Sequence, residues 1–326
     1  MTDLFDPFFK GKKVFMELIF LEPIFKERLW GGQKLKTLYN YNIPHNHIGE
    51  CWAISAHKNG SNKVLNGKYK GLTLDELYKK YKIELFNDDP SESFPILVKI
   101  LDANDDLSIQ VHPDDLYARV HANDFGKTEC WYVIDAEKDS RIVDGHQAKT
   151  KAEFLDKIKH NDLSLWQYRS IKKHDFISIP AKKVHAIGKG AVIYEVQQSS
   201  DTTYRIYDYD RIQSDGTKRE LHLSQALDVL DMPSKKTKLY MTVDKNDAFE
   251  HYDYIKNKYF HLRRVLVKSS YYFKTKQYQL CSVLEGHGKV NDIEIHKGDH
   301  FIIFGNKDVQ NLSFEGNIEI MLTERP

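Results

Sequence analysis

Short apolar runs recur along most of the chain, separated by clusters of glycine, asparagine, aspartate and lysine. The runs are rich in valine, isoleucine, tyrosine and phenylalanine, which favour β-strands. They lie at 94–101, 107–111, 130–134, 175–179, 191–197, 278–284 and 300–304. Many short strands at such spacing are typical of antiparallel sandwiches and barrels, so the pattern predicts a mainly β fold.

Helical periodicity is limited to three places. Thr73 and Glu76 form a capping-box pattern, which predicts a helix over 74–81 because each side chain can pair with a free backbone N–H of the first turn. Residues 152–159 and 224–230 also gather their apolar side chains on one helical face. We interpret these helices as additions to a β core.

The polar, lysine-rich stretch 232–259 is typical of a connection between compact units. We place a boundary near residue 245, which divides a larger unit at 16–245 from a smaller C-terminal β-barrel unit at 246–326. Residues 1–15 carry little pattern and are interpreted as a leader, either disordered, tag-like or part of an upstream start.

Composition excludes several functional classes. The chain has 326 residues, 41% hydrophobic and 29% charged, as expected of a folded globular protein and not of a disordered one. The 48 lysines and arginines nearly cancel the 47 aspartates and glutamates. With a net charge of +1, no global field attracts nucleic acid or anionic lipid, so ligands must be recognised locally.

Targeting signals are also missing from the sequence. The longest apolar run, 94–101, is interrupted by a proline and a lysine and is far shorter than the roughly 20 residues of a membrane span. Asp3 and Asp6 stand where a signal peptide would be basic. We therefore expect a soluble, cytoplasmic protein. Three cysteines are too few and too widely spaced for a disulfide framework, and we expect them to be buried: Cys51, Cys130 and Cys281.

The segment DDLSIQVHPDD carries the strongest chemical signal. Side chains alternate across a strand, so Ser108, Gln110 and His112 share one face. Glu129 begins the next predicted strand, and His185 begins a later one. Two imidazoles, a carboxylate and an amide oxygen match the ligands of a borderline divalent cation. The alternative is coincidence, since the chain has 15 histidines and a histidine before proline is commonly a surface residue.

Further charged residues stand where burial is expected. Glu195 shares a face with Ile193 in a predicted strand, and Lys99 interrupts an apolar run. Lys127 lies two residues before Glu129. Buried lysines require an anion, which either the protein or a ligand can supply.

Arg205 lies between Tyr204 and Tyr207, and a guanidinium held among aromatic rings suits phosphate or carboxylate oxygens. The alternative is a salt bridge to Asp208 or Asp210.

Six segments taken together resemble type I mannose-6-phosphate isomerase, also called phosphomannose isomerase, in its short bacterial form. The resemblance covers about 17–231, and LSIQVHPDD with GKTE is its most specific part. The segments are LWGG, GECWAIS, FPILVKILDANDDLSIQVHPDD, GKTECWY, IPAKKVHAIG and YEVQQSSDTTYRIYDYDR.

The resemblance implies two cupin-type jelly-roll β-barrels, with one Zn²⁺ in the first. The second barrel lacks a comparable set of histidines and glutamate in a strand context, so we expect no metal there. It implies reversible conversion of mannose 6-phosphate to fructose 6-phosphate, so a small sugar phosphate is the expected partner. The implied metal ligands are Gln110, His112, Glu129 and His185. The implied pocket residues are Ser108, Lys99, Lys127, Glu195 and Arg205.

Aldose–ketose isomerisation moves a proton between adjacent carbons through an enediol, and a divalent cation can stabilise the developing oxyanion. Glu195 and Lys127 are both candidates for the base, and the sequence does not separate them. Arg205 could stabilise the enediolate or anchor the phosphate, while Lys99 and Ser108 are candidates for substrate binding. Two other classes stay open from the residues alone: an Fe(II) cupin oxygenase and a non-catalytic sugar-phosphate binder.

Overall fold

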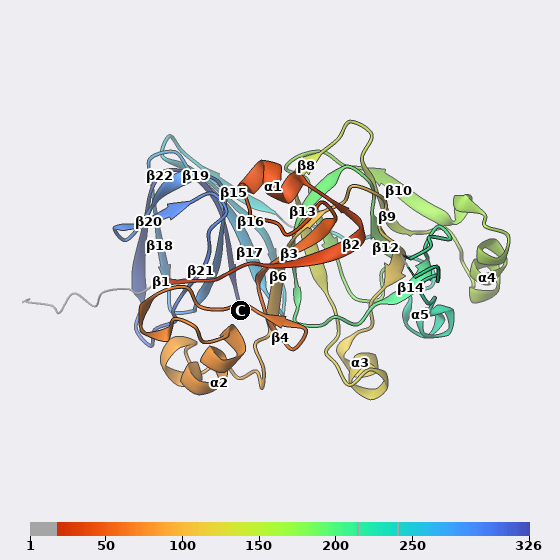
Figure 1. Cartoon of the computed structure of the whole chain (residues 1–326), viewed down its shortest axis with the longest axis horizontal. Coiled ribbons are helices and arrows are strands. Elements are labelled where there is room, and N and C mark those ends of the chain that lie inside the picture. The colour runs from red at the N-terminus through yellow and green to blue at the C-terminus, as the bar shows by residue number, and fades with distance from the viewer. Residues whose placement is uncertain (1–17, 214, 240) are drawn as a thin grey trace, which may run out of the picture.

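A computed structural model of the chain describes residues 18–213, 215–239 and 241–326. The leader predicted at 1–15 lies outside these residues. The protein is mainly β, and all pairings between its described strands are antiparallel. Two β units lie side by side, with the helices on their outer surfaces (Figure 1). The prediction of a mainly β fold is confirmed.

The first unit contains two large sheets. The six-stranded sheet has the order β11 (Phe176–Ile179), β8 (Glu129–Ala136), β13 (Ala191–Gln198), β6 (Ile96–Asp102), β3 (Ile48–Ile54) and β2 (Ile24–Gly32). The five-stranded sheet has the order β10 (Trp166–Ser170), β9 (Arg141–His146), β12 (His185–Ile187), β7 (Ile109–Val111) and β14 (Tyr204–Tyr207). A small hairpin pairs β4 (Ala56–His57) with β5 (Gly60–Ser61).

The second unit is one nine-stranded sheet around its own apolar core. Its main path is β1 (Leu18–Phe20), β21 (His300–Ile303), β19 (Gln279–Val290), β22 (Gln310–Glu324), β17 (His261–Val267), β16 (Phe249–Lys256) and β15 (Thr242–Lys245). Beside this path, β18 (Ser270–Thr275) pairs with β22 and β20 (Ile293–His296) pairs with β19. Among the described residues no sheet closes into a hydrogen-bonded ring, so the predicted barrels are jelly rolls of open sheets.

The five α-helices of the described ranges lie outside the sheets: α1 (Lys34–Tyr39), α2 (Leu74–Leu85), α3 (Asp115–His121), α4 (Lys151–Lys159) and α5 (Leu223–Val229). The predicted capping box is present, since Thr73 accepts from the Glu76 amide and Glu76 accepts from the Thr73 amide. The helix continues past its predicted end, with a kink at Tyr81. No helix within these ranges is long and apolar enough to cross a membrane.

The structure departs from the simple two-unit division of the sequence in two places. The stretch 232–259 is not a plain connection, because β15 and β16 lie within it. β15 is exposed and β16 is mostly half-buried, so their apolar alternation is weak. β1 pairs with β21 of the second unit, a long-range contact that no local sequence pattern indicates. The domain boundary near 245 stays a prediction.

The inner strands β3, β6, β8 and β13 of the six-stranded sheet are buried on both faces. Leu101, Trp131 and Ile193 pack toward the five-stranded sheet, whereas the alternate residues Tyr132 and Tyr194 pack toward the second unit. The two aromatic hydroxyls also donate across this junction, 2.6 Å to Glu319 Oε1 and 3.1 Å to Ser282 Oγ respectively. Alternation therefore sends one set of side chains into the first unit and the other set into the junction between units.

We predict that Phe176→Ala lowers the free energy of unfolding by about 3 kcal/mol, because a large buried ring leaves a cavity. Phe176 is buried in this junction and stacks on Tyr254, with ring centroids 4.6 Å apart. Tyr272→Ala is the control, since that ring is 72% exposed on β18. Urea unfolding measures both variants, and equal small effects would show that the junction is not a continuous core.

Candidate metal centre and substrate cavity

The ends of three strands from the two large sheets bring three of the predicted ligands together. His112 follows β7, Glu129 begins β8 and His185 begins β12. In the five-stranded sheet, Gln110 lies directly opposite His185 on one side and Arg205 on the other. Antiparallel pairing thus aligns Gln110, His185 and Arg205, which are far apart in the sequence. Gln110 and Arg205 also line a polar cavity at this end of the two sheets.

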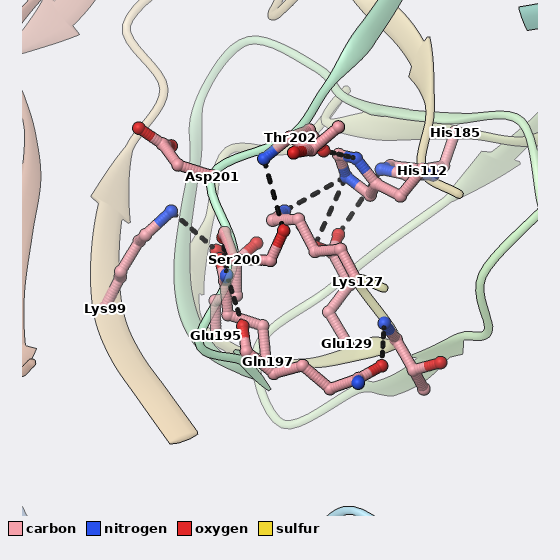
Figure 2. Close-up of polar contacts among 12 residues, drawn as sticks. Lys99, His112, Lys127, Glu129, His185, Glu195, Gln197, Ser200, Asp201 and Thr202 are labelled. Atoms are coloured by element: carbon pink, nitrogen blue, oxygen red, sulfur yellow. Dashed lines mark hydrogen bonds and ion pairs between the residues drawn. The ribbon is translucent and has the colours of Figure 1, made fainter. Parts of the chain in front are cut away.

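His112, Glu129 and His185 form a compact buried cluster, with one potential ligand atom from each lying within 4.8 Å of the others. Glu129 Oε2 is 3.4 Å from His112 Nε2, and Glu129 Oε1 is 3.3 Å from His185 Nε2. The two imidazole ring centroids are 4.7 Å apart. Figure 2 shows the three side chains converging from separate strands.

Backbone carbonyls fix the orientation of both imidazoles. His112 Nδ1 lies 3.0 Å from the Thr202 carbonyl oxygen, and His185 Nδ1 lies 2.8 Å from that of Lys183. A carbonyl oxygen only accepts hydrogen bonds, so each Nδ1 carries the proton and each neutral ring presents its Nε2 lone pair to Glu129. This arrangement of a second hydrogen bond behind the ligating nitrogen is typical of metal-binding histidines.

The electrostatics of the cluster favour a bound cation. Burial and then the charge of Lys127 lower the pKa of His112 to about 3, and burial also lowers the pKa of His185. Burial would raise the pKa of Glu129, but Lys127 and His112 outweigh it and hold that pKa well below its usual range. Glu129 Oε1 and His185 Nε2 are buried, and neither has a hydrogen-bond partner among the described residues. A carboxylate facing two unprotonated nitrogens is a donor set suited to a divalent cation.

Lys127 places a positively charged side chain directly against the cluster. Its Nζ donates to Glu129 Oε2 and lies 3.0 Å from His112 Nε2. The side chain is nearly inaccessible to solvent but reaches the wall of a cavity in front of the cluster. Sequence reasoning predicted that this lysine needs an anion, and Glu129 is that anion.

The cavity has a volume of about 470 Å³ and is lined by polar and charged side chains. Six residues predicted from sequence line it: Lys99, Ser108, Gln110, Lys127, Glu195 and Arg205. The other three, His112, Glu129 and His185, are buried behind its wall. All nine sequence-predicted residues therefore belong to one region of the molecule.

Lys99, Glu195 and Trp131 lie in one row across the six-stranded sheet. Lys99 Nζ is 3.4 Å from Glu195 Oε1, and the Trp131 indole N–H donates to Glu195 Oε2 at 3.0 Å. Burial and then the charge of Glu129 raise the pKa of Glu195, because two carboxylates share this inner face. Burial lowers the pKa of Lys99, but Glu50 and Glu195 more than offset this and raise it.

Arg205 does not form the salt bridge considered as an alternative. Asp208 instead pairs with Arg211 and Arg219, and Asp210 pairs with Lys218. The Arg205 guanidinium donates from Nη1 to the Glu220 carbonyl at 2.7 Å, while its buried Nε has no hydrogen-bond partner in the part of the chain that the structure describes. Burial and then the charge of Arg219 lower its pKa.

Sequence reasoning missed other charged groups of the cavity wall. They are Glu27, Arg28, Glu50, Asp201 and Arg219. Glu50 is in a segment that carries the family resemblance, and its position inside an apolar strand could have identified it. Burial would raise its pKa, but Lys99 and Arg28 lower it to about 2. Arg219 lies in a polar loop, which has no periodic pattern to indicate which way its side chain points.

Jelly-roll sheets with a buried histidine–carboxylate cluster behind a polar cavity define a cupin-type protein with a candidate metal centre. Comparisons with known proteins agree. Residues 18–139 match the model for the catalytic domain of type I phosphomannose isomerase, and residues 250–324 match the mannose-6-phosphate isomerase cupin domain.

Relatives similar over nearly the full length narrow the assignment. A probable mannose-6-phosphate isomerase of Bacillus subtilis is 44% identical, covering 94% of this chain and 98% of the relative. The mannose-6-phosphate isomerase of Streptococcus mutans is 42% identical, with coverage of 94% and 97%. The chain belongs to the type I phosphomannose isomerase family.

Solved structures support the same fold. The crystal structure of a Bacillus subtilis mannose 6-phosphate isomerase superposes with a TM-score of 0.90 at 37% identity, covering 94% of this chain and 99% of that chain. An Archaeoglobus fulgidus structure described as a putative mannosephosphate isomerase has a TM-score of 0.77 at 22% identity, with coverage of 96% and 100%, and bears on the fold alone.

We predict that Lys127→Met destabilises the chelator-treated protein by about 3 kcal/mol, because Glu129 then loses its buried counter-charge. Lys182→Met is the matched control, since Lys182 forms a partly exposed pair with Asp114 and should contribute less than about 1 kcal/mol. Urea unfolding of both variants checks this. Similar losses in the two would mean that the Lys127–Glu129 pair carries no special weight.

Proposed function

We propose that this protein interconverts mannose 6-phosphate and fructose 6-phosphate, using one divalent cation, Zn²⁺, held by Gln110, His112, Glu129 and His185. The observation that carries the proposal is the buried Glu129 carboxylate between two imidazole Nε2 lone pairs. Nitrogen and oxygen donors of this kind suit zinc, and Gln110 stands beside His185 in the sheet. The names of the relatives supply the substrate.

When bound, such a cation acts as a Lewis acid that polarises a carbonyl and stabilises adjacent negative charge. The chain must then move protons. We assign carbon-to-carbon transfer to Glu195, which takes the proton from carbon 2 of mannose 6-phosphate and returns it to carbon 1. Its raised pKa brings it closer to that of an efficient acid–base group at neutral pH. It also lines the cavity.

Lys127 is the better candidate for the oxygen protons. Its Nζ donates to Glu129, and an ammonium group has no lone pair to accept a proton, so it serves poorly as a base toward carbon. From the cavity wall it can give a proton to the carbonyl oxygen and recover one from the neighbouring hydroxyl. The two transfers together leave both residues as they began.

The cationic side chains of the cavity suit an anionic substrate. Arg205 stands beside Gln110 in the sheet, so we assign its guanidinium to the enediolate oxygen. Lys99, Ser108 and Arg219 line the same cavity, and we assign them to the hydroxyl and phosphate groups. Binding energy from the phosphate would then hold the reacting carbons in place.

We predict that His112→Ala and His185→Ala each lose both bound zinc and isomerase activity. His146→Gln is the control, because His146 is also a buried histidine of the five-stranded sheet but lies outside the cluster. Elemental analysis and a coupled assay for fructose 6-phosphate measure the two properties. Full activity in a metal-free variant would contradict the proposal.

We predict that Arg205→Ala lowers kcat by about 100-fold or more, since a charge aimed at a developing oxyanion is lost. Its zinc content should equal that of the unaltered protein. Arg169→Ala, at a half-exposed arginine on β10 of the same sheet, should leave the kinetics unchanged. Unaltered turnover in Arg205→Ala would remove this residue from the mechanism.

A further inference from the structure

Asp124, in the loop before β8, connects two distant parts of the chain. Its Oδ2 accepts from Ser200 Oγ at 2.9 Å, from Thr202 Oγ1 at 2.7 Å and from the Asp201 amide at 3.3 Å. Its Oδ1 accepts from the next amide in its own loop, that of Phe125, at 2.8 Å. One carboxylate therefore ties the loop that leads to Lys127 and Glu129 to the turn that follows β13.

That turn carries the carbonyl that orients His112. Thr202 accepts from His112 Nδ1 through its backbone oxygen, at 3.0 Å, while its side chain donates to Asp124. Asp201 is exposed, but Ser199 and Ser200 before it are buried, and Gln197 Nε2 donates to the Ser200 carbonyl at 2.6 Å from the opposite side. Figure 2 shows Gln197, Ser200 and Thr202 following one another toward His112.

We infer that Asp124 is a positioning residue for the metal centre: by clamping the 200–202 turn, it holds the Thr202 carbonyl that fixes the tautomer and ring orientation of His112. This inference rests on the proposed metal site, and it concerns a residue outside the cavity wall. Three donors converging on one oxygen require an ionised acceptor, which a neutral side chain replaces poorly. Without the clamp, the turn can move away and His112 loses the bond that keeps its Nε2 unprotonated toward Glu129.

The contacts of Asp124 should affect how tightly the cation binds, which precedes catalysis. Groups that hydrogen-bond to the rear nitrogen of a metal-binding histidine typically contribute 10–100-fold to metal affinity. Asp124 acts one step behind such a group, and Asp201 of the same turn lines the cavity. Loss of the clamp should therefore weaken zinc binding as well as turnover.

The test compares zinc affinity by chelator competition in the unaltered protein, Asp124→Ala and Asp105→Ala. Asp105 is the matched control: it is exposed and accepts from the next amide at 2.8 Å, as Asp124 does, but no cross-loop bond of its side chain is found among the described residues. We expect Asp124→Ala to raise the Kd for zinc about 10-fold or more. Asp105→Ala should leave it unchanged. Asp124→Asn, which keeps the shape of the side chain, replaces Asp124→Ala if the latter does not fold.

A second readout does not depend on metal. Nitrogen NMR of metal-free protein with labelled histidine should show a single Nδ1–H tautomer for His112, and a mixture in the Asp124 variants. Unchanged zinc affinity and an unchanged tautomer would overturn the positioning role while leaving the proposed isomerase intact. If the unaltered protein bound no zinc, the proposed metal centre would fail. Even in that case, a difference in the His112 tautomer between the unaltered protein and the Asp124 variants would support the role of Asp124 in orienting His112.

Discussion

The arrangement of the first unit depends on one electrostatic constraint, a carboxylate that is ionised although it is buried. Glu129 can remain charged only because positive charge lies next to it, and the adjacent imidazoles are neutral with their lone pairs turned inward. Lys127 satisfies part of this requirement. Three further features surround the same electron-rich cluster. They are the carbonyls behind both imidazoles, the sheet pairing that aligns Gln110 with His185, and the neighbouring charged cavity.

Much of this cluster could be predicted from the sequence because strands have a period of two. Once 130–134 and 191–197 are recognised as strands, alternation places Glu129, directly before the first strand, on the face of Trp131, and Glu195 on the face of Ile193. Charged residues on a face that otherwise carries buried side chains indicate a site. The family resemblance, now supported by relatives over nearly the whole chain, then selects which charged residues belong together.

The parts that escaped prediction lie where periodicity ends. Arg219 reaches the cavity from a loop and is held there by Asp208, a contact that depends on how the loop folds back. The Asp124 clamp joins two loops that are 76 to 78 residues apart in sequence, and neither has a repeating pattern. The sequence prediction also placed residues 18–20 in the first unit. In the structure these residues form β1, which pairs with β21 and joins the sheet of the second unit, a long-range contact that composition does not indicate.

The double burial of the six-stranded sheet has a consequence for the dynamics of the molecule. Strands β6, β8 and β13 are covered by the five-stranded sheet on one side and by the second unit on the other. Their amide hydrogens can reach solvent only when one of these layers separates, so they should be among the last to exchange with deuterium. Glu129 and Glu195 are thus anchored in the slowest-exchanging part of the chain, whereas the cavity loops can fluctuate without displacing them.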